Sequence, residues 1–134
     1  MDLSFIVIDD SDLDCFIAKK IIEQTKKYFA VKIFRNAKPA LELIRANTLS
    51  SAGNLTIILL DLHMPLMNGF QFVEDFETLS LDIQEGYKIN ILSSTRNKTD
   101  IHRLLKYKKV SNFIEKPLTK DKLSSMLAQF EMEV

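Results

Sequence analysis

The chain has little cysteine, no excess of charge and no long apolar segment. Its only cysteine is Cys15, so an internal disulfide is excluded and a reducing cytoplasm is the expected setting. We interpret Cys15 as a packed thiol. No repeat, low-complexity tract or linker-like segment interrupts the 134 residues. The sequence therefore predicts one domain over residues 1–134, with no output domain attached.

The balance of charge gives no sign of a polyanionic partner. Lys and Arg number 18 and Asp and Glu number 18, so no overall basic field would attract nucleic acid or acidic lipid. The longest apolar stretches, such as residues 57–60, are far too short to cross a bilayer. The first residues, 1–4, lack the basic region of a signal peptide. We expect a soluble, cytoplasmic protein that binds neither nucleic acid nor membrane.

Apolar runs of strand length alternate along the chain with segments of helical period. The runs are continuous rather than alternating, which is typical of parallel strands covered on both faces. Five strands are predicted, at residues 5–8, 29–34, 56–61, 89–93 and 110–115. Helices are predicted from about Ser11 to Lys27, after Asn36, from Phe70 to Glu77, from Lys98 to Tyr107, and around Leu123 to Phe130. At the start of the first helix, Ser11 and Asp14 are predicted to form an N-cap pair. Residues 47–54 and 82–87 are predicted to be loops.

This alternation predicts an α/β domain with a doubly wound parallel sheet of five strands and five helices. Ligands of such sheets bind beyond the carboxyl ends of the strands. Polar residues stand at four of these ends: Asp9 and Asp10, Asp61, Ser93, and Lys116. The sequence therefore predicts a polar site along one edge of the sheet.

Three carboxylates at one edge would repel each other and raise one another's pKa values unless a cation compensated them. All the candidate ligands are hard oxygen donors, so Mg²⁺ fits better than a transition metal. The carboxylates carry −3, and Mg²⁺ with Lys116 supplies +3, so the loaded site would accept a phosphoryl donor. Asp61 stands alone after the most apolar strand and is the candidate nucleophile, whereas Asp9 and Asp10 suit a metal. Ser93 would donate a hydrogen bond to the phosphoryl group.

Four motifs in the same order resemble the receiver domain of response regulators in two-component systems. They are Ile8-Asp9-Asp10, residues 60–69 (LDLHMPLMNG), Leu92-Ser93-Ser94, and residues 113–117 (FIEKP). The match extends over almost the whole chain. It implies a flavodoxin-like (CheY-like) fold with strand order 2-1-3-4-5.

The resemblance also implies a role for each residue at the metal and phosphoryl sites. Asp61 would accept the phosphoryl group, and Asp10 and Asp61 would bind Mg²⁺ directly. The backbone carbonyl of His63 would be a third ligand, and Asp9 would act through a metal-bound water. Lys116 would pair first with Asp61 and then with the phosphoryl group.

Ser93 and Phe113 would form the switch pair of such a domain, with the hydroxyl moving toward the phosphoryl oxygen and the ring turning inward. Phe113 stands where many relatives have tyrosine, which puts in doubt any output that needs that hydroxyl. The peptide bond before Pro117 would be cis. A sensor histidine kinase or histidine phosphotransfer protein would donate the phosphoryl group, and the sequence does not identify the downstream protein.

Other functions stay open at this point. The chain could be a phosphorelay intermediate or an excised receiver of a larger regulator or hybrid kinase. A phosphatase of the haloacid dehalogenase type would use Asp10 and Asp12 as its Asp-x-Asp pair, but it would leave residues 61–69 without a role. A binding module that kept the fold and lost the switch is a further alternative. Apart from self-catalysed phosphorylation and dephosphorylation, we expect no enzymatic activity.

The first helix predicts a docking surface for the phosphodonor. At about 100° per residue, Ile17, Ala18, Ile21 and Ile22 form the arc that should face the sheet, while Leu13 and Phe16 fall outside it. Exposed apolar residues beside a site suggest an interface. We expect Pro117 and Leu118 to extend this surface. The alternative is that a neighbouring loop or helix covers Phe16.

Overall fold

The five strands form one parallel sheet, as the sequence predicted, in the order 2-1-3-4-5 that the resemblance implied. The computed structural model describes residues 3–26, 29–46 and 54–132. The strands are β1 (Leu3–Ile8), β2 (Ala30–Phe34), β3 (Leu55–Leu60), β4 (Tyr87–Ser93) and β5 (Val110–Glu115). Because every neighbouring pair is parallel, all five carboxyl ends lie at the same edge of the sheet.

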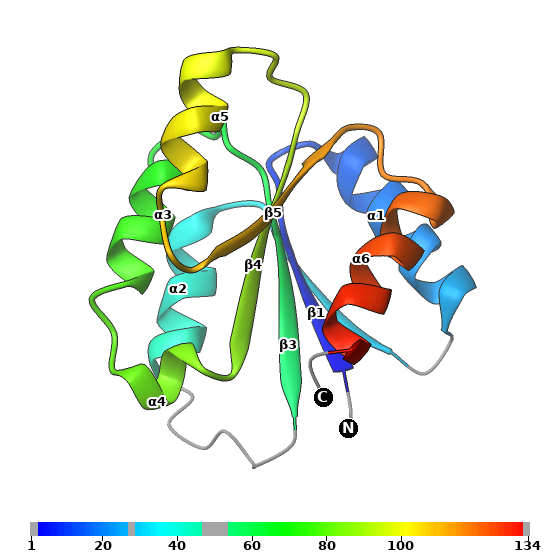
Figure 1. Cartoon of the computed structure of the whole chain (residues 1–134), viewed down its shortest axis with the longest axis horizontal. Coiled ribbons are helices and arrows are strands. Elements are labelled where there is room, and N and C mark those ends of the chain that lie inside the picture. Colours follow the sequence, from blue (N-terminus) through cyan, green and yellow to red (C-terminus); the bar gives the residue numbers. More distant parts are fainter. Residues whose placement is uncertain (1–2, 27–28, 47–53, 133–134) are drawn as a thin grey trace.

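Helices cover both faces of the sheet (Figure 1). They are α1 (Asp12–Thr25), α2 (Ala37–Ala46), α3 (Gly69–Phe76), α4 (Leu81–Gln84), α5 (Lys98–Leu105) and α6 (Lys120–Met132). Helices α1 and α6 lie on one face, and α2, α3 and α5 lie on the other. Each face has its own hydrophobic core, which explains why the central strands are apolar at successive positions rather than alternating.

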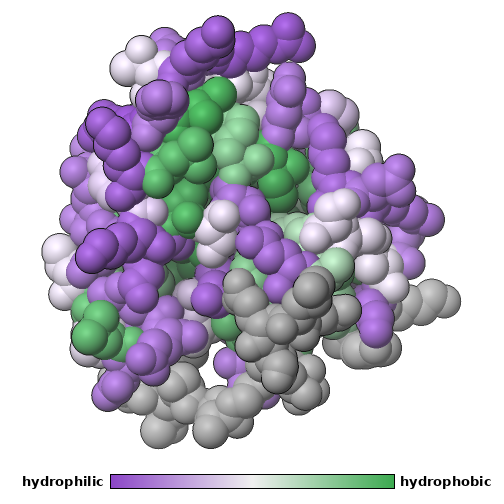
Figure 2. Space-filling view, viewed as in Figure 1, coloured by the Kyte–Doolittle hydropathy of each residue, from purple (hydrophilic) through white to green (hydrophobic). Residues whose placement is uncertain are grey.

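The surface seen from this side is mostly hydrophilic, with a hydrophobic area over α5 and β5 (Figure 2). Among the residues that the structure describes, no helix is long and apolar enough to cross a bilayer.

The prediction of a loop over residues 82–87 was wrong. The short helix α4 occupies part of this segment, and β4 already begins at Tyr87, so the domain has six helices rather than five in the part of the chain that the structure describes. Ser80 caps α4 by accepting a hydrogen bond from the amide of Ile83. The buried amide of Gln84 donates to the carbonyl oxygens of Glu77 and Leu79. These contacts give hydrogen-bond partners to the polar side chains of Ser80 and Gln84, of which Gln84 lies in the segment that we predicted to be a loop. Of the other predicted loop, residues 47–53 lie outside the described residues.

Gly69 allows helix α3 to start against the end of β3. Its amide donates to the carbonyl oxygen of Leu62 at 2.8 Å. A Cβ atom at this position would lie 3.0 Å from the carbonyl oxygen of Asp61 and 3.0 Å from the Cα of Leu62. Both are backbone atoms at or next to the candidate nucleophile, so they can move only by displacing the end of β3. Asn68 and Gln71 close a reciprocal capping box around the same turn.

We expect Gly69→Ala to lower the free energy of unfolding by about 1–3 kcal/mol, because the added methyl group overpacks this turn. Urea denaturation followed by circular dichroism measures the change. Glu74→Ala is the control, since Glu74 is an exposed residue of the same helix and its replacement should change the free energy of unfolding by less than about 0.5 kcal/mol. An unchanged midpoint for Gly69→Ala would contradict the steric explanation.

Candidate functional site

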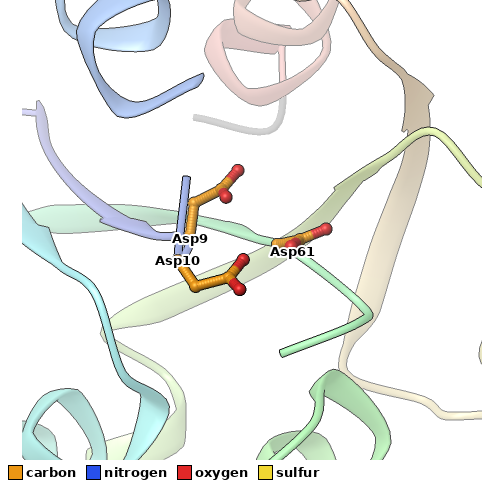
Figure 3. A group of neighbouring side chains, drawn as sticks. All are labelled: Asp9, Asp10 and Asp61. Carbon is orange, nitrogen blue, oxygen red and sulfur yellow. The ribbon is translucent and has the colours of Figure 1, made fainter. Parts of the chain in front are cut away.

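Asp9, Asp10 and Asp61 form an acidic cluster at the carboxyl edge of the sheet. We call these three residues the acidic triad. Asp9 and Asp10 follow β1 and Asp61 follows β3, and these two strands pair directly, with Ile8 opposite Leu60. One carboxylate oxygen of each residue lies within 4.8 Å of the others (Figure 3). Asp9 and Asp61 are buried, whereas Asp10 is exposed. The predicted convergence of these side chains is confirmed.

Backbone hydrogen bonds hold the strand ends in place. The amide of Asp61 donates to the carbonyl oxygen of Ile8 at 2.8 Å, and the amide of Asp9 donates to that of Phe34 at 3.0 Å. On the other side of the site, the amide of Lys116 donates to the carbonyl oxygen of Ser93 at 3.0 Å. The residues after β1, β3 and β5 are thus fixed by the sheet itself.

Lys116 extends from the end of β5 into the acidic triad. Its Nζ lies 2.8 Å from Asp9 Oδ2 and 3.5 Å from Asp61 Oδ1. A third carboxylate, Asp14 Oδ2, also lies at 2.8 Å. Burial disfavours the charged ammonium, but the hydrogen bonds to Asp14 and Asp9 and the charge of Asp61 outweigh it, so the pKa of Lys116 lies above its ordinary value. Lys116 is therefore a permanent cation of the site.

The carboxyl group of Asp61 is destabilised in its charged form. Burial is the largest cause and the charge of Asp9 the next, and together they raise the pKa of Asp61 to about 6 although Lys116 opposes them. The predicted mutual repulsion of the carboxylates is present, and Lys116 alone does not compensate it. The site has a deficit of positive charge that a divalent cation would reduce.

The other predicted site residues lie at or near the carboxyl ends of three neighbouring strands, at different depths: Ser93 in β4, His63 after β3 and Phe113 in β5. Ser93 ends β4, next to β3, and is buried; its Oγ accepts a hydrogen bond from the amide of Thr95 at 3.2 Å. Phe113 is partly buried and packs against the core beneath α5. The His63 side chain is exposed, with Nε2 3.8 Å from an oxygen of Asp100.

Asp14 is a site residue that the sequence interpretation missed. We predicted that Ser11 and Asp14 form an N-cap pair, and the amide of Asp14 does donate to Ser11 Oγ at 3.2 Å. The carboxylate of Asp14, however, binds Lys116. With Asp14 included, four carboxylates (−4) face Lys116 and one divalent ion (+3), which leaves −1 rather than the neutral balance we expected. The available signal was that Asp14 is an acidic residue in the first turn of α1, directly after the acidic pair Asp9 and Asp10.

The second carboxylate of the phosphatase alternative does not reach the site. The Asp12 side chain is exposed and pairs with Arg35. The Asp-x-Asp arrangement of Asp10 and Asp12 is therefore not assembled in this structure.

The exposure predicted for the apolar residues Leu13 and Phe16 of α1 is confirmed, while their role in docking stays a prediction. Leu13 and Phe16 are 66% and 59% exposed, so no described loop or helix covers Phe16. Pro117 is exposed, and the bond before it is cis, as the resemblance implied. The inclusion of Leu118 was wrong, because its side chain is 3% exposed and belongs to the core beneath α1 and α6.

The buried arc of α1 lies slightly away from the predicted one. Cys15, Ala18 and Ile22 are buried, while Ile17 and Ile21 are only partly so. Cys15 is a packed thiol, as predicted: its Sγ donates to the carbonyl oxygen of Asp9 at 3.3 Å. Burial, reinforced by nearby carboxylates, raises its pKa to about 11, so the thiolate is suppressed.

Comparison with known proteins agrees with this geometry. Residues 5–128 match the model of the response regulator receiver domain family. The two-component response regulator 24 of Arabidopsis thaliana is 28% identical over 134 residues, which covers 98% of this chain and 86% of the relative. The crystal structure of a response regulator receiver protein from Dyadobacter fermentans superposes with a TM-score of 0.83 at 28% identity, covering 95% of this chain and 96% of that one.

A more distant structure has the same fold. It is the receiver domain of a sensor histidine kinase from Pseudomonas aeruginosa, which is 12% identical, has a TM-score of 0.76, and matches over 96% of this chain and 97% of that one. That structure holds a magnesium ion coordinated in its active-site cleft.

We expect Asp61→Asn to stabilise the metal-free protein at neutral pH. A raised pKa means that the folded protein binds the Asp61 proton more tightly than the unfolded chain. Below the ordinary pKa of 3.8 both states are protonated; stability is lost as the pH rises from there through about 6, and the loss is complete above it. Replacing the carboxylate should recover on the order of 1–3 kcal/mol above about pH 7.

Urea denaturation in EDTA at several pH values measures this effect. The advantage of the Asp61→Asn variant should shrink as the pH falls below about 6, and Mg²⁺ should reduce it by stabilising the wild type. A variant that is less stable than the wild type at neutral pH would contradict the assignment of a destabilised buried charge.

Proposed function

Because the chain belongs to the response regulator receiver domain family, we propose that it is a phosphorylation-controlled signalling switch whose phosphoacceptor is Asp61. The observation that carries the proposal is the position of this carboxylate. It is buried, lies within 4.8 Å of two further carboxylates and 3.5 Å from the ammonium of Lys116, and has an elevated pKa.

Mg²⁺ is the proposed cofactor. The triad offers three hard oxygen donors close enough to share one ion, and its charge deficit favours a divalent cation. Asp10 and Asp61 would bind the ion directly, with the His63 carbonyl as a further ligand and Asp9 acting through a water molecule. The magnesium ion in the Pseudomonas aeruginosa receiver domain supports this choice. When bound, the ion would neutralise charge on the phosphoryl oxygens.

The phosphoryl donor would be a sensor histidine kinase or a histidine phosphotransfer protein. An oxygen of Asp61 forms a bond to phosphorus while the phosphorus–nitrogen bond to the donor histidine breaks. Lys116 would then bind a phosphoryl oxygen, since its ammonium already lies beside Asp61. The reaction changes this chain itself, so we propose no activity on other substrates beyond self-catalysed phosphorylation and dephosphorylation.

Ser93 and Phe113 would transmit the phosphorylated state. The Ser93 hydroxyl holds only a weak bond to the Thr95 amide and can turn toward a phosphoryl oxygen. Phe113 lies in β5, where the structure has a hydrophobic surface area together with α5 (Figure 2). An inward turn of this ring would reshape that area and change the face offered to a downstream protein. The partners of the chain decide whether it is a terminal switch or a phosphorelay intermediate. Its cytoplasmic location stays a prediction.

Incubation with acetyl phosphate and Mg²⁺ tests the proposed function. The wild type should incorporate one base-labile acyl phosphate, and Asp61→Asn or EDTA should abolish the incorporation, because the nucleophile or the cation is missing. Lys116→Ala should weaken the conformational response, followed by NMR shifts of β5, more than it weakens Mg²⁺ affinity. Labelling of the Asp61→Asn variant at the normal rate would refute the proposal.

The exposed residues of α1 should dock the phosphodonor protein. We expect Leu13→Ser with Phe16→Ser to slow phosphotransfer from a phosphorylated histidine phosphotransfer protein by about tenfold, which corresponds to ~1.4 kcal/mol of lost docking energy. Labelling by acetyl phosphate should not change. The matched control is Leu81→Ser with Leu105→Ser, two other exposed leucines. Equal losses with both donors, or an equal loss in the control variant, would contradict docking at α1.

A further inference from the structure

The ammonium of Lys116 is bound more closely by Asp14 of α1 and by Asp9 than by Asp61. Its short contacts, both at 2.8 Å, are with Asp9 and Asp14, whereas the contact with Asp61 is 3.5 Å. The Lys116 side chain is 14% exposed and that of Asp14 33%, so the Asp14 contact is partly shielded from water. A charge-assisted hydrogen bond in such a setting is stronger than a surface ion pair.

The cap of α1 explains why the Asp14 carboxylate is available for this contact. In a reciprocal capping box, the side chain at this position would reach back to the amide of Ser11. Here that amide donates instead to Asp9 Oδ1 at 2.9 Å. Asp14 therefore gives its backbone amide to the Ser11 cap, while its carboxylate turns to Lys116.

The two acidic partners of Lys116 differ in what else they can do. Asp9 belongs to the acidic triad, whose other members lie within reach of a shared ion. Asp14 lies outside that group, so its carboxylate would stay available to Lys116 when the other three share an ion. A phosphoryl group on Asp61 would consequently compete with Asp14 for the same ammonium.

We propose that Asp14 is a positioning residue that restrains Lys116 on the α1 side of the site, so that phosphorylation of Asp61 requires the ammonium to give up this bond. The inference rests on the proposed function, since it concerns the approach of Lys116 to a phosphoryl group on Asp61. In this proposal, Lys116 moves away from α1 when Asp61 is phosphorylated. The first turn of α1 also carries the exposed Leu13.

Asp14→Asn tests the restraint. The variant loses the charged acceptor, which frees Lys116 to approach Asp61 and removes one negative charge from the site. Labelling by acetyl phosphate in Mg²⁺ should become about three- to tenfold faster. Asp14→Glu keeps a carboxylate and should restore most of the slow rate. Asp12→Asn is the matched control: it makes the same charge change on the same helix, at an exposed residue paired with Arg35, and should leave the rate unchanged within about twofold.

A double-mutant cycle separates positioning from charge alone. In a Lys116→Ala background, Asp14→Asn should no longer accelerate labelling, because the ammonium that it releases is absent. The same cycle in EDTA, measured by urea denaturation, should show a favourable coupling between Asp14 and Lys116 without any metal or donor. This second measurement does not depend on phosphorylation.

Two results would overturn the proposal. One is a rate for Asp14→Asn no higher than that for Asp12→Asn, and the other is an equal acceleration in the Lys116→Ala background. Both presuppose that the wild type is labelled on Asp61. A wild type that takes up no label would instead overturn the proposed function, while the coupling in EDTA would still report on the Asp14–Lys116 bond.

Discussion

The charge of the acidic triad is the constraint on which the rest of this structure depends. Parallel strands bring Asp9, Asp10 and Asp61 together, and two of these carboxylates are buried, where the charge of Asp9 raises the free energy of the charged form of Asp61. Lys116 reduces this cost without removing it. The same features that destabilise the metal-free protein would, under the proposed function, favour a divalent cation at this edge of the sheet.

The fold supplies the precision that such a site needs. The triad and Lys116 extend from sheet ends that are tied together by backbone hydrogen bonds, and the cores on both faces fix the sheet. Gly69 lets α3 begin directly against Asp61. Leu13 and Phe16 are exposed on α1, the helix that follows Asp9 and Asp10. Under the proposed function, this arrangement combines rigid placement of the acceptor carboxylate with free access for a protein donor.

The sequence could predict the strands and the polar residues at their ends, because both follow from which residues are buried and where each strand stops. Continuous apolar runs identified the strands, and the polar residues at their carboxyl ends identified Asp61, Lys116 and Ser93, because sheet geometry brings such positions together. Contacts that depend on side-chain direction could not be predicted. Leu118 is apolar and next to the site, yet it turns into the core. Helix α4 was missed because its polar residues are satisfied by the local bonds of Ser80 and Gln84.

Asp14 shows the same limit at the site itself. Its place in α1 was foreseen, but its bond to Lys116 spans the distance from α1 to β5 and depends on Ser11 donating its amide to Asp9. The sequence pattern alone predicted a role for Asp14 only in the N-cap of α1. This bond changes the charge balance of the site, and it connects the lysine to the helix that carries the exposed apolar residues. This bond therefore links the site to the helix proposed to dock the phosphodonor.

The most direct test of the account is to locate the acyl phosphate chemically. Borohydride reduces an aspartyl phosphate to homoserine, so peptide mass spectrometry after labelling and reduction identifies the residue that carried the phosphoryl group. The account predicts homoserine at position 61 and aspartate at positions 9, 10 and 14. Homoserine at position 10 with an intact Asp61 would contradict it and would revive a phosphatase-like chemistry at the end of β1.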